Sequence, residues 1–297
     1  MNFRILTDTS CNLPEHLVHE YDLDMMPLSY VIDGVPHTSY TDGRQADFRS
    51  FYDQLRRGVA VTTTLVSRGD AIEHGRRLLD AGEDVLYVGF SSGLSGTYQA
   101  VSEALGELAR EYPQRKVLCV DSLAASAGQG LFITYIARLR ERGATIEQCH
   151  RWALENRLNI CHWFTVDDLM FLKRGGRVSA VSAIFGTALS VKPVMHVDDA
   201  GTLKVVSKVR GRRKSIAALA ERFAAAKRLP DGVDRIVYIS HGDCYDDARL
   251  LADMIVQGYH DVAHPMEYPM ITYVDPVIGA HSGPGTLALF YFDVAGR

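Results

Sequence analysis

The first half of the chain alternates short apolar runs with segments whose apolar residues recur at helical spacing. Strands are predicted at 3–8, 26–33, 84–90 and 116–121. Helices are predicted at 47–58, 71–82, 97–112 and 124–142, and a turn-rich loop at 34–43. Strands that alternate with helices at this spacing form βαβ units, so this half predicts a mostly parallel sheet.

The second half has a different order of elements. Residues 161–178 begin like a strand and run into a basic glycine turn, and 191–211 predicts a hairpin that turns at 198–201. A helix, a strand and another helix follow, and 266–293 predicts strands around two glycine-rich turns. The predicted fold class is α/β, with a mostly parallel N-terminal βαβ domain at 1–160 and an α+β domain at 161–297.

Length, charge and cysteine usage narrow the possible functions. A chain of 297 residues can bury one large core or two smaller ones, and a net charge of −4 argues against a general nucleic-acid binder. The five cysteines are scattered without a CxxC pair, which signals neither a zinc site nor a disulfide framework. No signal-peptide pattern and no apolar run of about 18 residues is present. We expect a cytoplasmic protein with reduced thiols and no metal or other cofactor.

A serine- and glycine-rich loop, 91–96 within VGFSSGLSGTY, lies between a predicted strand and a predicted helix. Ligands collect at the carboxyl ends of parallel strands, and the first turn of a helix offers free amides to an anion. A Walker A loop would carry lysine where Thr97 follows Gly96, and GxGxxG is absent. A singly charged carboxylate therefore fits this serine–glycine loop better than a phosphate, and the competing interpretation is a turn and helix cap without a ligand.

Ser95 also follows a strand, as the nucleophile of a serine hydrolase does. The pattern is G-L-S-G-T rather than G-x-S-x-G, and His281 with Asp121 could complete a triad. His281 lies in the densest glycine–proline cluster, 279–285, where backbone can approach a ligand closely. Among the other histidines, His241 is its nearest rival.

Hydroxyl and basic clusters supply the remaining candidates. The run VTTTLVS at 61–67 predicts an extended segment that either presents two hydroxyls on one face or forms only a strand edge. Basic residues gather in FLKRGGRV at 171–178 and in VRGRRKS at 209–215. These charges are either solvated surface or docking sites for an acidic or phosphorylated partner.

Together these segments resemble the DegV family. The matching segments run in order along nearly the whole chain, at 7–14, 62–70, 91–100, 121–130, 171–178, 191–193, 209–214 and 278–289. The serine–glycine loop and the H-x-G-P-G turn that starts at His281 are the most specific of them. One segment departs: the family commonly reads T-S-Q-P-S-P, whereas this chain reads TTLVSR at 63–68, keeping Thr63 but neither proline.

The resemblance implies a two-domain protein that buries a long-chain fatty acid between its domains and is not itself an enzyme. By that resemblance, Ser95 and Thr63 would bind the acyl carboxylate with help from Ser92 or the Gly96 amide. His281 and Arg177 would belong to the network around the head group.

The resemblance also implies a partner, an ATP-dependent fatty acid kinase that receives the carboxylate and forms an acyl phosphate. The docking candidates are Arg174 and the cluster Arg210, Arg212, Arg213 and Lys214. A serine hydrolase that uses Ser95 and a sensor of another carboxylated metabolite are the alternative functions.

Overall fold

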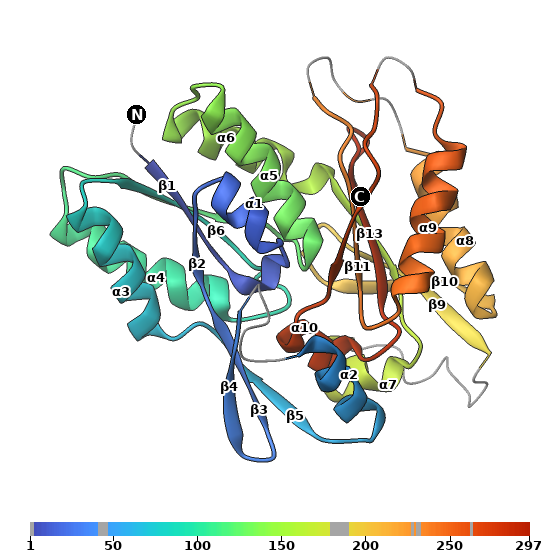
Figure 1. Ribbon diagram of the computed structural model, residues 1–297. Helices are drawn as coiled ribbons and strands as arrows, with labels where there is room; N and C mark the ends of the chain where they lie inside the picture. Colours follow the sequence, from blue (N-terminus) through green and yellow to red (C-terminus); the bar gives the residue numbers. More distant parts are fainter. Residues whose placement is uncertain (1–2, 41–46, 179–189, 227–228, 230–232, 262–263) are drawn as a thin grey trace.

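The computed structural model describes residues 3–40, 47–178, 190–226, 229, 233–261 and 264–297. Figure 1 shows two large sheets on either side of a central helix, with a small third sheet at one end. The fold is mixed α/β, and its N-terminal sheet is parallel, as the sequence predicts.

The parallel sheet has the strand order β2-β1-β6-β7. Its strands are β1 (Phe3–Asp8), β2 (Leu23–Met26), β6 (Asp84–Gly89) and β7 (Val117–Asp121). The segments between these strands contain η1 (Thr9–Cys11), α1 (Glu15–Glu20), α3 (Arg68–Asp80) and α4 (Thr97–Glu111). After β7, helices α5 (Ala127–Glu141), α6 (Ile146–Asn156) and η2 (Arg157–Asn159) lead to the mixed sheet. Successive strand residues pack in different cores, Ile5 towards α5 and Leu6 towards α3 and α4. Both faces are therefore covered, which explains the nearly continuous apolar strands.

The mixed sheet has the strand order β10-β9-β8-β13-β11-β12, and among these strands β11 and β12 pair in parallel while the other neighbours are antiparallel. Its strands are β8 (Ile160–Thr165), β9 (Val191–Val197), β10 (Leu203–Arg210), β11 (Val237–His241), β12 (Met270–Tyr273) and β13 (Leu287–Phe292). Helices α8 (Arg212–Ala224) and α9 (Tyr245–Gly258) pack on its outer face. The chain enters this sheet at Ile160, and the division into domains at 160/161 stays a prediction.

The small sheet has the order β4-β3-β5 and projects from the end of the molecule (Figure 1). Its strands are β3 (Leu28–Ile32), β4 (Val35–Ser39) and β5 (Val61–Thr64). Helices α2 (Phe48–Arg56), α7 (Leu169–Arg174) and α10 (Pro276–Ser282) lie between it and the mixed sheet.

The N-terminal sequence predictions need two corrections here. The single strand predicted at 26–33 is divided at Pro27 into β2 and β3, which belong to different sheets. The loop predicted at 34–43 begins instead with β4, and residues 41–46 lie outside the described residues. Asp33 and Gly34 both have positive φ, 50° and 80°, and join β3 to β4 as a two-residue hairpin turn. An Asp-Gly pair is a strong signal for such a turn.

Three helices are also missing from the sequence prediction: α6, α10 and α7, which lies where the sequence predicts a strand running into a basic glycine turn. The predicted glycine-rich turn around residue 279 is helix α10, because the Asp275 carboxylate caps the Val277 and Ile278 amides and Pro276 occupies the first turn. Helix α6 begins with a capping box between Thr145 and Gln148. Both caps are visible in the sequence once a helix is considered there.

Helix α5 is the structural centre of the molecule. Every residue from 127 to 137 is buried, and its side chains pack against both the parallel and the mixed sheet. A helix that is apolar on all sides must be covered on all sides. The two sheets are therefore held together through α5, which Figure 1 shows between them.

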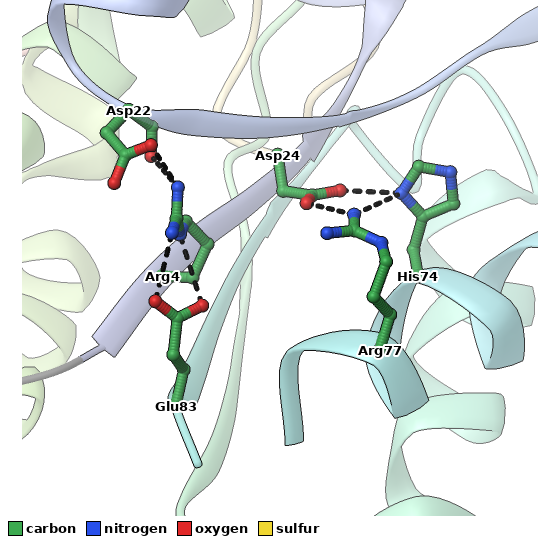
Figure 2. Close-up of polar contacts among 6 residues, drawn as sticks. All are labelled: Arg4, Asp22, Asp24, His74, Arg77 and Glu83. Atoms are coloured by element: carbon green, nitrogen blue, oxygen red, sulfur yellow. Dashed lines mark hydrogen bonds and ion pairs between the residues drawn. The ribbon is translucent and has the colours of Figure 1, made fainter. Parts of the chain in front are cut away.

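Ion pairs join strand β1 to residues that precede β2 and β6, and strand β2 to α3. Figure 2 shows two clusters, formed by Arg4, Asp22, Asp24, His74, Arg77 and Glu83. Arg4 Nη2 lies 2.9 Å from Glu83 Oε1, and Asp24 Oδ1 lies 2.5 Å from His74 Nδ1. Burial raises the pKa of Asp24, but hydrogen bonds from His74 and Arg77 outweigh it and hold that pKa below its ordinary value. These pairs stabilise the parallel sheet and its contact with α3, and none of the six residues lines the cavity described below.

None of the described helices is both long and apolar enough to cross a membrane.

Candidate ligand-binding site

A cavity of about 220 Å³ lies where the parallel sheet meets the mixed sheet and α10. Its walls come from the segments after β1, β6 and β7, from strands β8, β9, β10 and β13, and from α10. The apolar lining consists of Leu28, Leu65, Phe90, Leu94, Ala125, Phe164, Leu172, Val197, Leu203, Val274, Val277, Ile278, Ala288 and Phe290. The carboxyl ends of parallel strands thus open on an apolar space, which is where ligands collect in α/β sheets.

The cavity brings together most of the predicted head-group residues. Thr63, Ser95, Gly96, Arg177 and His281 all line it, although they come from β5, the serine–glycine loop, the turn after α7 and α10. Arg177 is the only charged residue among the described residues of the lining. An apolar space with one cation and several hydroxyls suits a singly charged anion with an apolar body.

Thr63 and His281 are hydrogen-bonded to each other. Thr63 Oγ1 lies 2.8 Å from His281 Nε2, so strand β5 and helix α10 meet at this point. Burial, reinforced by the nearby positive charge of Arg177, lowers the pKa of His281 to about 4. His281 is therefore a neutral imidazole at pH 7, able to hold Thr63 without adding a second positive charge. The rival histidine, His241, lies outside the cavity lining and accepts a hydrogen bond from the Cys244 amide.

The serine–glycine loop places Ser95 directly before helix α4. Ser95 Oγ accepts a hydrogen bond from the Thr97 amide at 3.2 Å and lies 3.0 Å from Thr97 Oγ1. Its hydroxyl thus sits at the amino end of a 15-residue helix, where partial positive charge favours an anion. Within the described part of the chain, no residue accepts a hydrogen bond from the Gly96 amide, which leaves that donor available to a ligand.

Arg177 reaches the cavity because the turn that carries it packs against α10. A Cβ atom on Gly175 would lie 2.4 Å from His281 Nδ1, and one on Gly283 would lie 2.5 Å from the Phe171 ring. These two glycines let the basic turn and the H-x-G-P-G turn approach each other. Arg177 Nε then donates to the Leu94 carbonyl oxygen at 3.2 Å, which ties the guanidinium to the serine–glycine loop.

Ser282 is a cavity residue that the sequence prediction missed. Its Oγ atom is buried, and no other described residue forms a hydrogen bond with it. An unpaired buried hydroxyl is costly, so such an atom commonly marks a place where a ligand or water completes the hydrogen bonding. The only signal in the sequence is its position next to His281.

Ser92 does not join the other predicted head-group residues. Its side chain is exposed and absent from the cavity lining, and its amide donates to Asp121 Oδ1 at 3.2 Å. Ser92 thus faces solvent, whereas Ser95 in the same loop lines the cavity.

The residues of the alternative hydrolase triad are engaged separately. Asp121 Oδ1 accepts from the Ser92 and Leu123 amides, His281 pairs with Thr63, and Ser95 pairs with Thr97. A serine nucleophile needs its histidine within hydrogen-bond reach and a carboxylate behind that histidine. The described hydrogen bonds form no such relay.

The basic residues of the two clusters differ in whether their side chains are paired with carboxylates or exposed to solvent. Arg212 is only partly exposed and lies 2.8 Å from Asp247 Oδ2 and 3.5 Å from Asp167 Oδ1. Arg212 therefore joins α8 to its neighbours, whereas the other docking candidates, Arg174, Arg210, Arg213 and Lys214, are accessible.

No cluster of three or more histidine, cysteine, aspartate or glutamate side chains suited to a metal ion occurs in the ranges that the structure describes.

Comparisons with known proteins assign nearly the whole chain to one protein family. Residues 2–294 match one family model, described as "Uncharacterised protein, DegV family". A DegV domain-containing protein of Clostridium perfringens is 38% identical over 291 residues, which cover 97% of each chain.

Two solved structures add what similar proteins bind. A DegV lipid-binding protein of Thermotoga maritima is 27% identical, with a TM-score of 0.84 and full coverage of both chains. A DegV family protein of Thermus thermophilus, described by its fatty acid binding, is 26% identical, with a TM-score of 0.85 over 99% of this chain and 100% of that one.

The neutral state of His281 gives a testable pH dependence. Because its folded-state pKa of about 4 lies below the ordinary value near 6.5, the unfolded chain takes up the proton first. The stability that depends on a neutral His281 is therefore present above about pH 6.5 and is lost as pH falls towards 4. Proton–carbon NMR spectra of ligand-free protein, assigned with His281→Gln, should show a neutral ring at pH 6 that titrates near pH 4. A His281 ring that titrates near pH 6.5 would contradict this description of the site.

Proposed function

The chain belongs to the DegV family, and on that premise we propose that it binds a long-chain fatty acid and presents the carboxylate to an ATP-dependent fatty acid kinase. The observation that carries the proposal is the cavity itself, with its apolar walls, its hydroxyls and its single cation. The fatty acid binding described for structurally similar DegV proteins supports the same ligand.

The apolar tail supplies most of the affinity. Each buried methylene contributes about 0.8 kcal/mol, so a tail of about 15 methylenes offers about 12 kcal/mol before costs. Loss of translational freedom and of chain flexibility offsets part of this gain. Side chains such as Phe164 and Phe290 supply the surface on which the tail is buried.

The head group supplies orientation. Ser95 Oγ, Thr63 Oγ1 and the Gly96 amide are the proposed donors to the carboxylate, and Arg177 balances its charge. Three of these groups already have partners that hold them in place: Thr63 is held by His281, Ser95 by Thr97 and Arg177 by the Leu94 carbonyl. Hydrogen bonds to a charged carboxylate are stronger than neutral ones, which favours the ionised acid.

Presentation to a kinase requires an accessible surface around the head group. Leu65 lines the cavity and is 46% exposed, so the carboxylate end lies near solvent at the loop after β5. The exposed cations Arg174, Arg210, Arg213 and Lys214 are the proposed docking residues. Arg212 is left out of this set, since its guanidinium is already paired with Asp167 and Asp247.

We expect Ser95→Ala to weaken binding of palmitate, measured by isothermal titration of delipidated protein. A lost hydrogen bond to a charged group costs about 1.5–3 kcal/mol, which is about tenfold to a hundredfold in Kd. Thr63→Ala should act in the same direction, and the two effects should not add, since both hydroxyls face one carboxylate.

Two substitutions provide matched controls for this experiment. Ser92→Ala removes a hydroxyl from the same loop outside the cavity, and Thr62→Ala removes an exposed hydroxyl from the same strand. Both should bind palmitate as wild type does. Wild-type affinity in Ser95→Ala and Thr63→Ala would assign the head group to a different part of the cavity.

Charge reversal at Arg210 and Arg213 should slow acyl phosphate formation by a fatty acid kinase while leaving fatty acid affinity unchanged. Exposed charges are screened beyond about 8–10 Å at physiological ionic strength, so the difference from wild type should shrink as salt is added. The matched control reverses the exposed Arg110 and Arg151 on α4 and α6, with the same change in net charge. Equal kinase rates for all three proteins at low salt would remove this cluster from the docking surface.

A further inference from the structure

The turn of the β9–β10 hairpin packs directly on the serine–glycine loop. Ser91 Oγ donates a hydrogen bond to the Gly201 carbonyl oxygen at 2.8 Å, across a separation of 110 residues. Ser91 is completely buried. The hairpin belongs to the mixed sheet and the loop to the parallel sheet, so this bond joins the two sheets at the edge of the cavity.

Two glycines make this close approach possible. A Cβ atom on Gly93 would lie 2.6 Å from the Ala200 carbonyl oxygen, and one on Gly201 would lie 2.1 Å from Ser91 Oγ. Gly201 also has a φ of +71°, which other residues rarely adopt. The loop and the turn can therefore approach closely enough for the Ser91 hydroxyl to reach the Gly201 carbonyl.

The hairpin turn is also held by hydrogen bonds of its own. Asp198 Oδ1 accepts hydrogen bonds from the Ala200 amide at 3.1 Å and from the Thr202 amide at 2.8 Å. The Asp198 carbonyl oxygen accepts a further bond from Arg297 Nη1 at 2.9 Å. A turn fixed in this way can hold the position of whatever packs against it.

Ser91 in turn sets the position of Ser95. The Ser91 carbonyl oxygen accepts hydrogen bonds from the Leu94 amide at 3.0 Å and the Ser95 amide at 3.1 Å. Ser91 Oγ also accepts from the Gly93 amide at 3.2 Å while it donates to Gly201. One residue thus carries both the turn that presents Ser95 and the contact to the hairpin.

We propose that Ser91 and Gly201 are positioning residues that clamp the serine–glycine loop to the hairpin, hold Ser95 towards the ligand carboxylate and slow ligand release. The proposal rests on the proposed function for its ligand. Val197 and Leu203, on either side of the hairpin turn, line the cavity, so a bound tail touches the same element that clamps the head-group loop. Ligand binding and the contact between loop and hairpin therefore stabilise each other.

The test measures release of oleate with a ¹³C-labelled carboxyl group from loaded protein into excess phosphatidylcholine vesicles. Ser91→Ala should release oleate about threefold to tenfold faster, the range that one lost hydrogen bond supports. The carboxyl carbon shift of bound oleate should also change, because Ser95 moves. Ser207→Ala, an exposed position on the same hairpin, should leave both quantities at their wild-type values.

Gly201→Ala provides the second variant, because its Cβ would collide with Ser91 Oγ. It should also speed release, and its effect in the Ser91→Ala background should be smaller than in wild type. Independent effects of the two substitutions, or wild-type release and carboxyl shifts in both, would overturn the clamp.

Hydrogen exchange of ligand-free protein separates this proposal from the proposed function. In Ser91→Ala and Gly201→Ala, exchange of the segment containing the Leu94 and Ser95 amides should accelerate, whereas Ser207→Ala should not change it. If wild type binds no oleate, the proposed function fails, and unchanged exchange in the clamp variants would overturn the clamp as well.

Discussion

Burial of α5 on every side is the constraint on which the rest of the structure depends. Because residues 127–137 expose no face to water, the parallel sheet and the mixed sheet must both cover the helix. That arrangement brings the segments after β1, β6 and β7 to the inner face of β8 and β13. The cavity is the space left at this meeting, and its apolar walls are the continuation of the core around α5.

The electrostatics of the cavity follow from its burial. A single guanidinium, Arg177, faces a space lined with hydroxyls, and burial lowers the pKa of this arginine from its ordinary value. His281 is kept neutral by the same burial, so no second cation accumulates. A carboxylate with one negative charge balances such a site, whereas a phosphate would leave charge uncompensated in a medium that solvates it poorly.

Local signals carried most of what the sequence could predict. A short stretch of residues predicts the strand, loop and helix around Ser95. Another predicts the extended segment that contains Thr63. Long-range placement was harder, because it depends on packing. The approach of Arg177 to the cavity requires Gly175 to lie against His281, and the pairing of Arg212 with Asp247 requires α8 to lie beside α9. Neither contact can be predicted from the residues that neighbour it in the sequence. Helix α10 is not predicted, because its glycine and proline residues indicate a turn more strongly than the N-cap at Asp275 indicates a helix.

The most direct test of the central claim is mass spectrometry of an organic extract from the purified, undelipidated protein. If the cavity between the two sheets holds a fatty acid, the extract should contain one long-chain fatty acid for each chain, and the native protein should show the matching increase in mass. Delipidation followed by addition of oleate should restore that mass. An extract without acyl chains, together with a delipidated protein that takes up neither oleate nor palmitate, would contradict the account.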